Sequence, residues 1–208
     1  MIFKDRQDAG KKLAQSLLAY RDQPETWVLG LPRGGVVVAS EVAKHLHLPL
    51  DILVIRKLGA PDNPEFAIGA VDEKGHALFN EGVLEDLGIS EVYKKEILEK
   101  EKKEAEHRLH LYRKNRPPLD FKDKTVILID DGLATGATMR AAVYSAKAKK
   151  AKKVIVAVPV AAPSSLEKLQ GEADEVIYLD APYFFGAVSS FYERFDQTTD
   201  EEVIELLS

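Results

Sequence analysis

The chain has 208 residues, of which 45% are hydrophobic and 30% are charged, values that are ordinary for a soluble globular protein. The net charge of −5 repels nucleic acid phosphates and argues against a nucleic-acid-binding domain. The absence of cysteine excludes disulfides, thiolate nucleophiles and cysteine-ligated zinc, and no apolar run reaches the roughly 18 residues of a membrane span. The first residues are charged and amphipathic, unlike a signal peptide, so we expect a cytoplasmic protein with neither a nucleic acid nor a membrane as partner.

Five apolar runs rich in valine, leucine and isoleucine are predicted as strands, and they cover residues 26–31, 50–56, 125–131, 154–160 and 175–180. Strands of this kind usually lie in a parallel sheet that is covered on both faces. Helical patterns follow at 34–47, 138–150 and 164–170. The alternation predicts a doubly wound α/β fold, with a mainly parallel five-stranded sheet and helices on both faces.

The alternation is interrupted between the second and third runs. Glycine and prolines predict a loop at 57–65, and residues 66–80 read as a hairpin with its turn near 73–75. A long charged helix is expected from the cap at Ser90 to about Lys114, ended by Arg116-Pro117-Pro118. We therefore expect one domain over 1–208, with an inserted hairpin and long helix at about 66–116 and a small C-terminal hood at about 181–208.

The role of the charged helix at 90–114 stays open. It could be a lid or an oligomer contact, because His107, Arg108 and Arg113 lie near its end, or simply a solvated amphipathic helix. The lysines at 147–153 complement the dipole of a helix C-terminus and need no further function.

Two adjacent acids, Asp130 and Asp131, end the third run and precede a loop of small residues. Ligands of an open parallel sheet bind beyond the carboxyl ends of its strands, where helix N-termini offer free amides. Four or five hydrogen bonds of roughly 1.5–3 kcal/mol each can hold a phosphate there without the lysine of a P-loop. The acids suit sugar hydroxyls or a hydrated Mg²⁺, so a sugar phosphate is the predicted ligand. The predicted phosphate loop consists of Ala134, Thr135, Gly136, Ala137 and Thr138.

The stretch IDDGLATGATM (129–139) closely resembles the ribose-phosphate signature of type I phosphoribosyltransferases. The resemblance extends from about residue 26 to 179 and implies the type I phosphoribosyltransferase fold. It assigns the ribose hydroxyls to Asp130 and Asp131 and the 5′-phosphate to the loop at 134–138. Residues 85–118 match least well, because the family's connection before the signature strand is usually shorter.

Two further segments match the places where this family binds pyrophosphate. LPRGG (31–35) follows the first strand, and Arg33 and the Gly34 amide would serve as pyrophosphate donors. IRK (55–57) ends the next predicted strand, so the resemblance implies the same role for Arg56 and Lys57. The loop at 57–65 stands where relatives carry a flexible loop that closes over the reaction.

Recognition of the acceptor is less well defined by the sequence. The hypoxanthine-guanine branch of the family usually has an acid where this chain has Ala134, which is more similar to the adenine branch without assigning adenine. Relatives stack an aromatic ring of the C-terminal hood on the base, which implies base-binding roles for Tyr183, Phe184 and Phe185. These rings could equally pack the C-terminal segment onto the core.

The resemblance implies transfer of the 5-phosphoribosyl group from 5-phosphoribosyl-1-pyrophosphate (PRPP) to a nitrogenous base, with a purine-like acceptor favoured and pyrophosphate released. Asp130, Asp131 and Arg33 would be the catalytic residues, Mg²⁺ would bind through the substrate without a direct protein ligand, and a homodimer is expected. No general acid or base is recognisable among the histidines.

Two other functions remain open at this stage. A non-catalytic PRPP- or nucleotide-binding regulator would use the same pocket, because a fold does not decide a function. A hydrolase with an aspartate nucleophile would need further metal-binding acids, which DDGLATGAT lacks.

Overall fold

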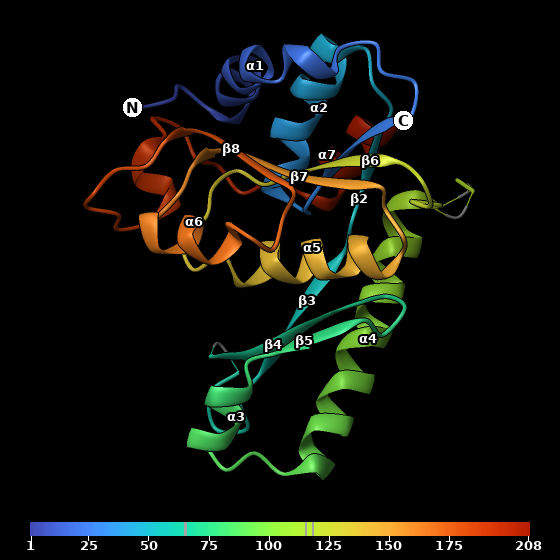
Figure 1. Cartoon of the computed structure of the whole chain (residues 1–208), viewed down its shortest axis with the longest axis vertical. Coiled ribbons are helices and arrows are strands. Elements are labelled where there is room, and N and C mark those ends of the chain that lie inside the picture. The colour runs from blue at the N-terminus through green and yellow to red at the C-terminus, as the bar shows by residue number, and fades with distance from the viewer. Residues whose placement is uncertain (65, 115, 118) are drawn as a thin grey trace.

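The computed structural model describes residues 1–64, 66–114, 116–117 and 119–208. At its centre lies a five-stranded sheet with the order β2-β1-β6-β7-β8, in which every neighbouring pair is parallel (Figure 1). Its strands are β1 (Thr26–Gly30), β2 (Leu50–Ile52), β6 (Thr125–Ile129), β7 (Lys153–Val160) and β8 (Glu175–Asp180). The predicted mainly parallel five-stranded sheet is confirmed.

Helices cover both faces of this sheet. Alternate residues of the strands point to opposite faces, so Ile127 packs under the first pair of helices and Leu128 under the second pair. The first face carries α1 (Arg6–Ser16) and α2 (Gly34–Leu46), and the second carries α5 (Ala137–Ala148) and α6 (Pro163–Leu169). The strands are continuously apolar because both of their faces are buried, as expected from the sequence.

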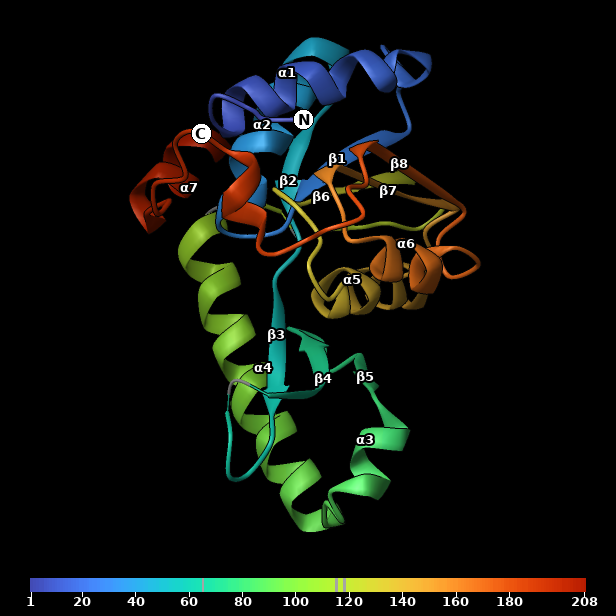
Figure 2. The ribbon, with the colours of Figure 1, turned by 90° about the vertical axis from the view of Figure 1, so that its left-hand side faces the viewer.

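A second, antiparallel sheet lies beyond α5 and has the order β3-β4-β5. It consists of β3 (Ile55–Gly59), β4 (Ala67–Asp72) and β5 (Ala77–Phe79), and it is followed by α3 (Glu81–Asp86) and α4 (Glu91–Arg113). Figures 1 and 2 show this sheet and the first half of α4 extending away from the main body. The predicted hairpin and the helix capped by Ser90 are thus present. The helix ends at Arg113, and Pro118 of the predicted stop lies outside the described residues.

The apolar run at 50–56 was predicted as one strand, and this prediction is wrong. The run divides at Leu53 and Val54, both buried, so that β2 belongs to the central sheet and β3 to the second one. The predicted loop at 57–65 is also wrong in its first part, because Lys57 to Gly59 continue β3. Its final residue, Glu65, lies outside the described residues. An apolar run indicates that its residues are buried, and here Leu53 and Val54 stay buried while the chain passes from one sheet to the other.

The C-terminal segment returns to the carboxyl ends of the central strands. It contains a 3₁₀ helix at Val188–Phe191 and ends in α7 (Asp200–Leu207), which packs with α2 and the end of α4. Tyr192 and Phe3 anchor the segment to the N-terminus, their ring centroids 5.4 Å apart. Within the part of the chain that is described, no helix has the length and apolar character to cross a bilayer.

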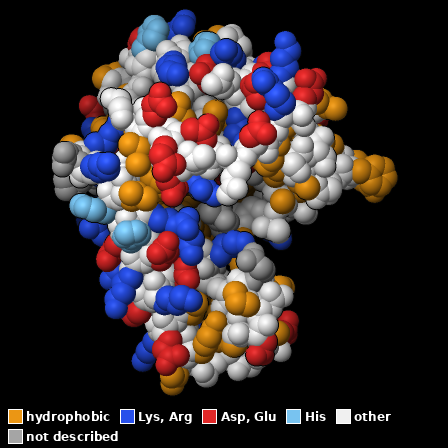
Figure 3. Space-filling view, turned by 180° about the vertical axis from the view of Figure 1, so that it is seen from behind, with side chains coloured by type: hydrophobic (Ala, Val, Ile, Leu, Met, Phe, Trp, Pro, Cys, Tyr) orange, Lys and Arg blue, Asp and Glu red, His pale blue; other side chains and the backbone are white. Residues whose placement is uncertain are grey.

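The molecule has an indentation between its main body and the second sheet (Figure 3). On the face shown there, acidic and basic side chains are intermixed and form no large region of a single sign. This distribution agrees with the charged character of α4, whose glutamates and lysines alternate along the helix.

Candidate functional site

Asp130 and Asp131 follow the last residue of β6 and lie at the carboxyl edge of the central sheet. The Asp130 Oδ1 atom accepts a hydrogen bond of 2.9 Å from the Asp131 amide. The Asp131 carboxylate is held from another part of the chain, because Arg6 Nε donates to its Oδ2 atom at 2.7 Å. The side chain of Asp131 is 15% exposed, and that of Arg6 is 12% exposed. The two acids are therefore fixed in place before any ligand binds.

The electrostatics of this pair follow from its burial. Burial raises the pKa of Asp130 well above its ordinary value, and the neighbouring Asp131 charge raises it further. Burial also raises the pKa of Asp131, although the hydrogen bond and positive charge of Arg6 oppose that rise. Burial therefore disfavours the ionised form of both carboxyls, and Arg6 offsets part of that cost at Asp131.

The predicted phosphate loop forms the turn between β6 and α5. Gly136 is the residue before α5, and its φ of 72° explains why a glycine stands there. The hydroxyl of Ser165 on α6 donates to the Ala134 carbonyl at 2.6 Å and fixes the loop from the other side. Among the described residues, the amides of Thr135, Gly136 and Thr138 have no hydrogen-bond acceptor. These donors at a helix N-terminus are suited to an anion.

The loop and the first acid enclose one pocket of about 180 Å³. Its lining includes Asp130, the whole predicted phosphate loop and Val188 of the C-terminal segment. The structure thus brings together the acid pair and the threonine loop, as the sequence predicted from their adjacency.

The LPRGG segment lies directly against the acids. A Cβ atom added to Gly34 would collide with Asp131 Oδ2 and lie 2.7 Å from Arg6 Nε. One added to Gly35 would lie 2.9 Å from Asp130 Oδ1. The two glycines are required for this close approach of the α2 N-terminus to the acids. Arg33 faces away toward α7, with its Nη1 atom 3.8 Å from Asp200 Oδ1.

Arg56 and Lys57 lie on β3 of the second sheet, outside the central sheet. The Arg56 guanidinium pairs with Glu101 of α4, through Nε at 2.9 Å and Nη2 at 2.7 Å from the same Oε2 atom. The structure therefore does not bring this pair of cations to the acids. Their pyrophosphate role stays a prediction, and for Arg56 it requires the pair with Glu101 to open.

The aromatic residues of the C-terminal segment divide into two groups. Tyr183 and Phe184 are each 87% exposed and meet edge to face, with ring centroids 5.0 Å apart. Phe185 packs instead against Phe191, within the cluster that anchors the C-terminal segment to the N-terminus. Neither group lines the pocket of the phosphate loop. Base binding by these three residues stays a prediction.

Sequence reasoning missed two residues that hold the acids. Arg6 is 125 positions from Asp131 in the chain, and Tyr192 donates its hydroxyl to the Asp131 carbonyl at 2.6 Å. No local pattern could identify Arg6, since it looks like any charged residue of an amphipathic helix. Tyr192 stood out only as one of several aromatic residues.

The protein groups that could ligate a metal are few at this site. Across the described part of the chain, no cluster of three or more histidine, aspartate or glutamate side chains is arranged to hold a metal ion. Carboxylate oxygens are nevertheless a ligand type that Mg²⁺ accepts together with phosphate oxygens of a substrate. Binding of Mg²⁺ through the substrate, without a direct protein ligand, stays a prediction.

Comparison with known proteins gives the same family over most of the chain. The sequence profile of the phosphoribosyl transferase domain matches residues 2–193. Two curated proteins of Mycobacterium tuberculosis, from strains CDC 1551 and H37Rv and provisionally named phosphoribosyl transferases, are each 42% identical over 206 residues. The match covers 99% of this chain and 46% of those proteins, so the chain spans about half the length of these relatives.

Solved structures agree with this placement. The protein TT1426 from Thermus thermophilus is 42% identical, with a TM-score of 0.86 over 100% of this chain and 98% of that one. A hypoxanthine-guanine phosphoribosyltransferase from Bacillus anthracis is 15% identical, with a TM-score of 0.50 over 88% of this chain and 83% of that one. The second likeness concerns the fold alone. With the signature loop, the glycine loop beside it and these matches together, the chain belongs to the phosphoribosyl transferase family.

Proposed function

We propose that this protein binds PRPP and transfers its 5-phosphoribosyl group to a nitrogenous base, with release of pyrophosphate. The observation that carries the proposal is the single pocket lined by Asp130 and the Thr135–Thr138 loop, with the Gly34 backbone against the neighbouring Asp131. A sugar that bears both a phosphate and a pyrophosphate is the ligand that uses all three parts.

The phosphate and the ribose occupy different parts of this site. The unpaired amides of the loop, with the hydroxyls of Thr135 and Thr138, bind the 5′-phosphate at the N-terminus of α5. Asp130 and Asp131 accept hydrogen bonds from the ribose hydroxyls, because ionised carboxylates only accept. This division keeps the two carboxylates away from the phosphate charge.

Pyrophosphate is released at the N-terminus of α2. The Gly34 amide and Arg33 supply donors there, and Arg56 and Lys57 add charge if β3 approaches. Mg²⁺ would bind through the substrate, and it would supply positive charge that offsets the charge of pyrophosphate. Catalysis then consists of positioning and of stabilising charge as the bond from C1 to pyrophosphate breaks.

The acceptor is proposed to be a flat, purine-like base. Tyr183 and Phe184 are available to stack on such a ring, because neither is part of the hydrophobic core. Ala134 offers no side-chain functional group to the base, so the loop itself does not select the acceptor.

The test is a screen of purine and pyrimidine bases for PRPP-dependent pyrophosphate release in the presence of Mg²⁺. The proposal expects release with at least one base, and loss of that release in Asp131→Asn. If PRPP binds and no base supports release, the catalytic part of the proposal is wrong.

A second candidate is a non-catalytic PRPP- or nucleotide-binding regulator. The observation that favours it is that two cations predicted to bind pyrophosphate already have acidic neighbours. Arg56 is paired with Glu101, and Arg33 lies near Asp200. A regulator would bind a nucleoside monophosphate as tightly as PRPP, because it does not need to hold pyrophosphate. Competition between the two ligands in calorimetry separates the candidates.

We further propose that the chain acts in the cytoplasm as a homodimer. The match covers 46% of the curated relatives, so the homodimer is proposed for the 208-residue chain and not for a longer protein. Sedimentation equilibrium of the 208-residue chain should give twice the monomer mass, and a monomer mass would contradict the proposal.

A further inference from the structure

Arg6 occupies the point where the two predicted ligand loops meet. Its Nε atom donates to Asp131 Oδ2 at 2.7 Å, which ties it to the ribose acids. The same Nε atom lies against the backbone of Gly34, since a Cβ atom there would be 2.7 Å from it. One guanidinium therefore contacts both the place proposed for the ribose and the place proposed for pyrophosphate.

The guanidinium is fixed on its other sides by the C-terminal segment. Its Nη1 atom donates to the Asp196 carbonyl at 2.6 Å, and its carbon lies 3.8 Å from the centroid of the Phe195 ring. Stacking on an aromatic face and bonding to a carbonyl both restrict the plane of the group. Arg6 is therefore ordered before a ligand arrives, at little further entropic cost.

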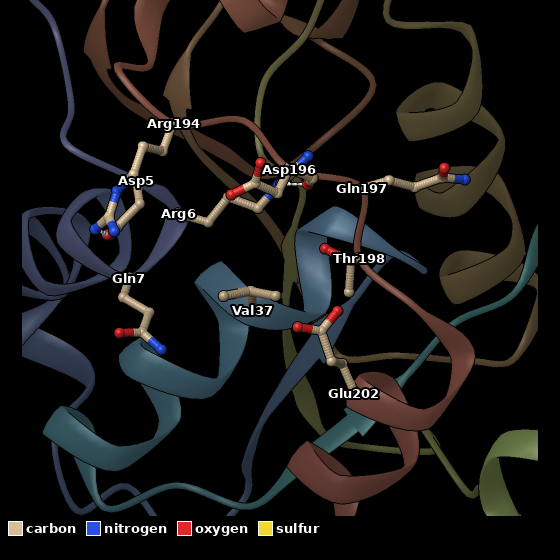
Figure 4. Close-up of a pocket in the computed structure, with 9 residues that line it drawn as sticks. All are labelled: Asp5, Arg6, Gln7, Val37, Arg194, Asp196, Gln197, Thr198 and Glu202. Carbon is tan, nitrogen blue, oxygen red and sulfur yellow. Dashed lines mark hydrogen bonds and ion pairs between the residues drawn. The ribbon is translucent and has the colours of Figure 1, made fainter.

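One edge of this ordered group remains available. An arginine side chain carries five N–H donors, and within the described residues the Arg6 Nη2 atom makes no hydrogen bond. The side chain lines a pocket of about 290 Å³ between α1, α2 and the C-terminal segment. Figure 4 shows Arg6 beside Asp196, with Val37 of α2 and Glu202 of α7 on the opposite side of the pocket.

We propose that Arg6 is a substrate-binding residue of this chain: it holds Asp131 in place for the ribose and donates its remaining N–H groups to the pyrophosphate of PRPP. This inference rests on the proposed function. Charge-assisted hydrogen bonds from a fixed guanidinium suit pyrophosphate, whose negative charge grows as it leaves.

A purely structural role is the competing explanation for Arg6. A cation that only neutralises a buried aspartate would affect every ligand of the site equally. A cation that contacts pyrophosphate distinguishes PRPP from ribose 5-phosphate, which lacks that group. The ratio of the two affinities therefore separates the explanations.

The experiment measures binding of PRPP with Mg²⁺ and of ribose 5-phosphate to the whole chain by titration calorimetry. For Arg6→Gln we expect PRPP affinity to fall about 10- to 100-fold, the range for one or two hydrogen bonds to a charged group. Affinity for ribose 5-phosphate should fall by a clearly smaller factor, because that ligand loses the positioning of Asp131 but has no pyrophosphate for Arg6 to contact. Arg6→Lys should recover part of the loss, since it keeps the charge without the planar fork.

The matched control is Arg194→Gln. Arg194 lines the same pocket but pairs with Asp5 and has a side chain that is 71% exposed. Its substitution should leave PRPP affinity unchanged. An equal loss in Arg194→Gln would show that only the general charge of the pocket matters, and would overturn the proposal.

Two other outcomes would also overturn it: unchanged PRPP affinity in Arg6→Gln, or an equal fall for PRPP and ribose 5-phosphate. If Arg6→Gln does not fold, the ratio of the two affinities in Arg6→Lys decides alone, because that variant keeps the charge beside Asp131. If the unmodified protein binds neither compound, the proposed function itself is wrong, which is a different result from a defect confined to the Arg6 variants.

Discussion

At the scale of single residues, the site depends on carboxylates and hydroxyls that the fold has partly removed from water. Asp130 and Asp131 have raised pKa values because of burial, and Arg6 opposes that rise only at Asp131 to a large extent. The hydroxyl of Thr138 lies at the N-terminus of α5, where unpaired amides already favour an anion. Asp→Asn and Thr→Val substitutions change the chemistry of these side chains with little change in volume, so their effects report on charge or hydrogen bonding rather than on packing.

Thr138→Val should weaken PRPP binding about tenfold or more, because one hydrogen bond to a charged phosphate contributes roughly 1.5–3 kcal/mol. Titration calorimetry measures this directly. Thr125→Val is the matched control, since Thr125 is the first residue of β6 and lies at the opposite end of that strand from the acids. Equal affinities in Thr138→Val and the unmodified protein would show that the loop does not hold the phosphate.

Asp130→Asn should stabilise the fold at neutral pH. Because the pKa of Asp130 is higher in the folded protein than in the unfolded chain, its ionisation costs folding free energy above that folded pKa. Replacing the carboxyl by a neutral amide removes this cost, so the free energy of unfolding should increase. The amide keeps an oxygen to accept the Asp131 N–H.

The pH dependence of that gain is the check on its cause. As the pH falls below the folded pKa, the carboxyl of the unmodified protein becomes neutral as well, and the gain should disappear. Urea denaturation at neutral pH and near pH 4 measures both conditions. A gain of equal size at both would mean that packing, rather than charge, explains the effect.

At the scale of elements, the site is made where two helix N-termini meet the end of one strand. The start of α2 approaches the acids so closely that only glycine fits at position 34. The start of α5 follows the same acids through Gly136. The distance between the parts of the site proposed for pyrophosphate and for the ribose is therefore set by backbone packing rather than by flexible side chains.

Gly34→Ala should disrupt this contact between the elements. Its Cβ atom would collide with Asp131 Oδ2 and press on Arg6 Nε, so PRPP affinity should fall at least tenfold and stability by about 1–3 kcal/mol, as for overpacked sites. Calorimetry and urea denaturation measure the two effects. Gly186→Ala is the control, because nothing lies within 4 Å of its added Cβ atom. Similar affinities in the two variants would contradict the close packing.

The elements also show what the sequence could predict. The strand, acids, loop and helix from Thr125 to Ala148 are contiguous, so local patterns predicted their order and the pocket they form. Arg6 lies 125 residues from its partner, and no local pattern carries that pairing. The division of the run at 50–56 was missed for a related reason, since periodicity records burial and not which strand is the neighbour.

At the scale of the whole molecule, a buried polar network joins the second sheet to the central body. Asp72 at the end of β4 accepts hydrogen bonds from Ser145 of α5 and from His76, and Lys149 Nζ lies 3.2 Å from its Oδ2 atom. Burial would raise the pKa of Asp72, but the Lys149 charge and these hydrogen bonds lower it overall. The second sheet, which carries Arg56 and Lys57, is thus held by ionic contacts as well as by apolar ones.

Asp72→Ala should therefore destabilise the protein by about 1–3 kcal/mol, because Ser145 and His76 lose their acceptor while Lys149 keeps Glu73 as an acidic partner. Since the folded pKa of Asp72 is depressed, its contribution is present above the unfolded pKa and is lost as pH falls through the folded one. Hydrogen exchange should show faster opening of β4 and β5 than of β6 and β7. Asp86→Ala, an exposed site on α3, should change neither measurement.

The central claim is that PRPP binds in the pocket lined by Asp130 and the threonine loop, with Asp131 beside it. It is tested most directly by calorimetric titration of PRPP with Mg²⁺ into the unmodified protein and into Asp131→Asn. We predict saturable binding to the unmodified protein and affinity at least about tenfold weaker in the variant, which loses a carboxylate acceptor for the ribose. Absence of binding to the unmodified protein, or equal affinity in both, would contradict the claim.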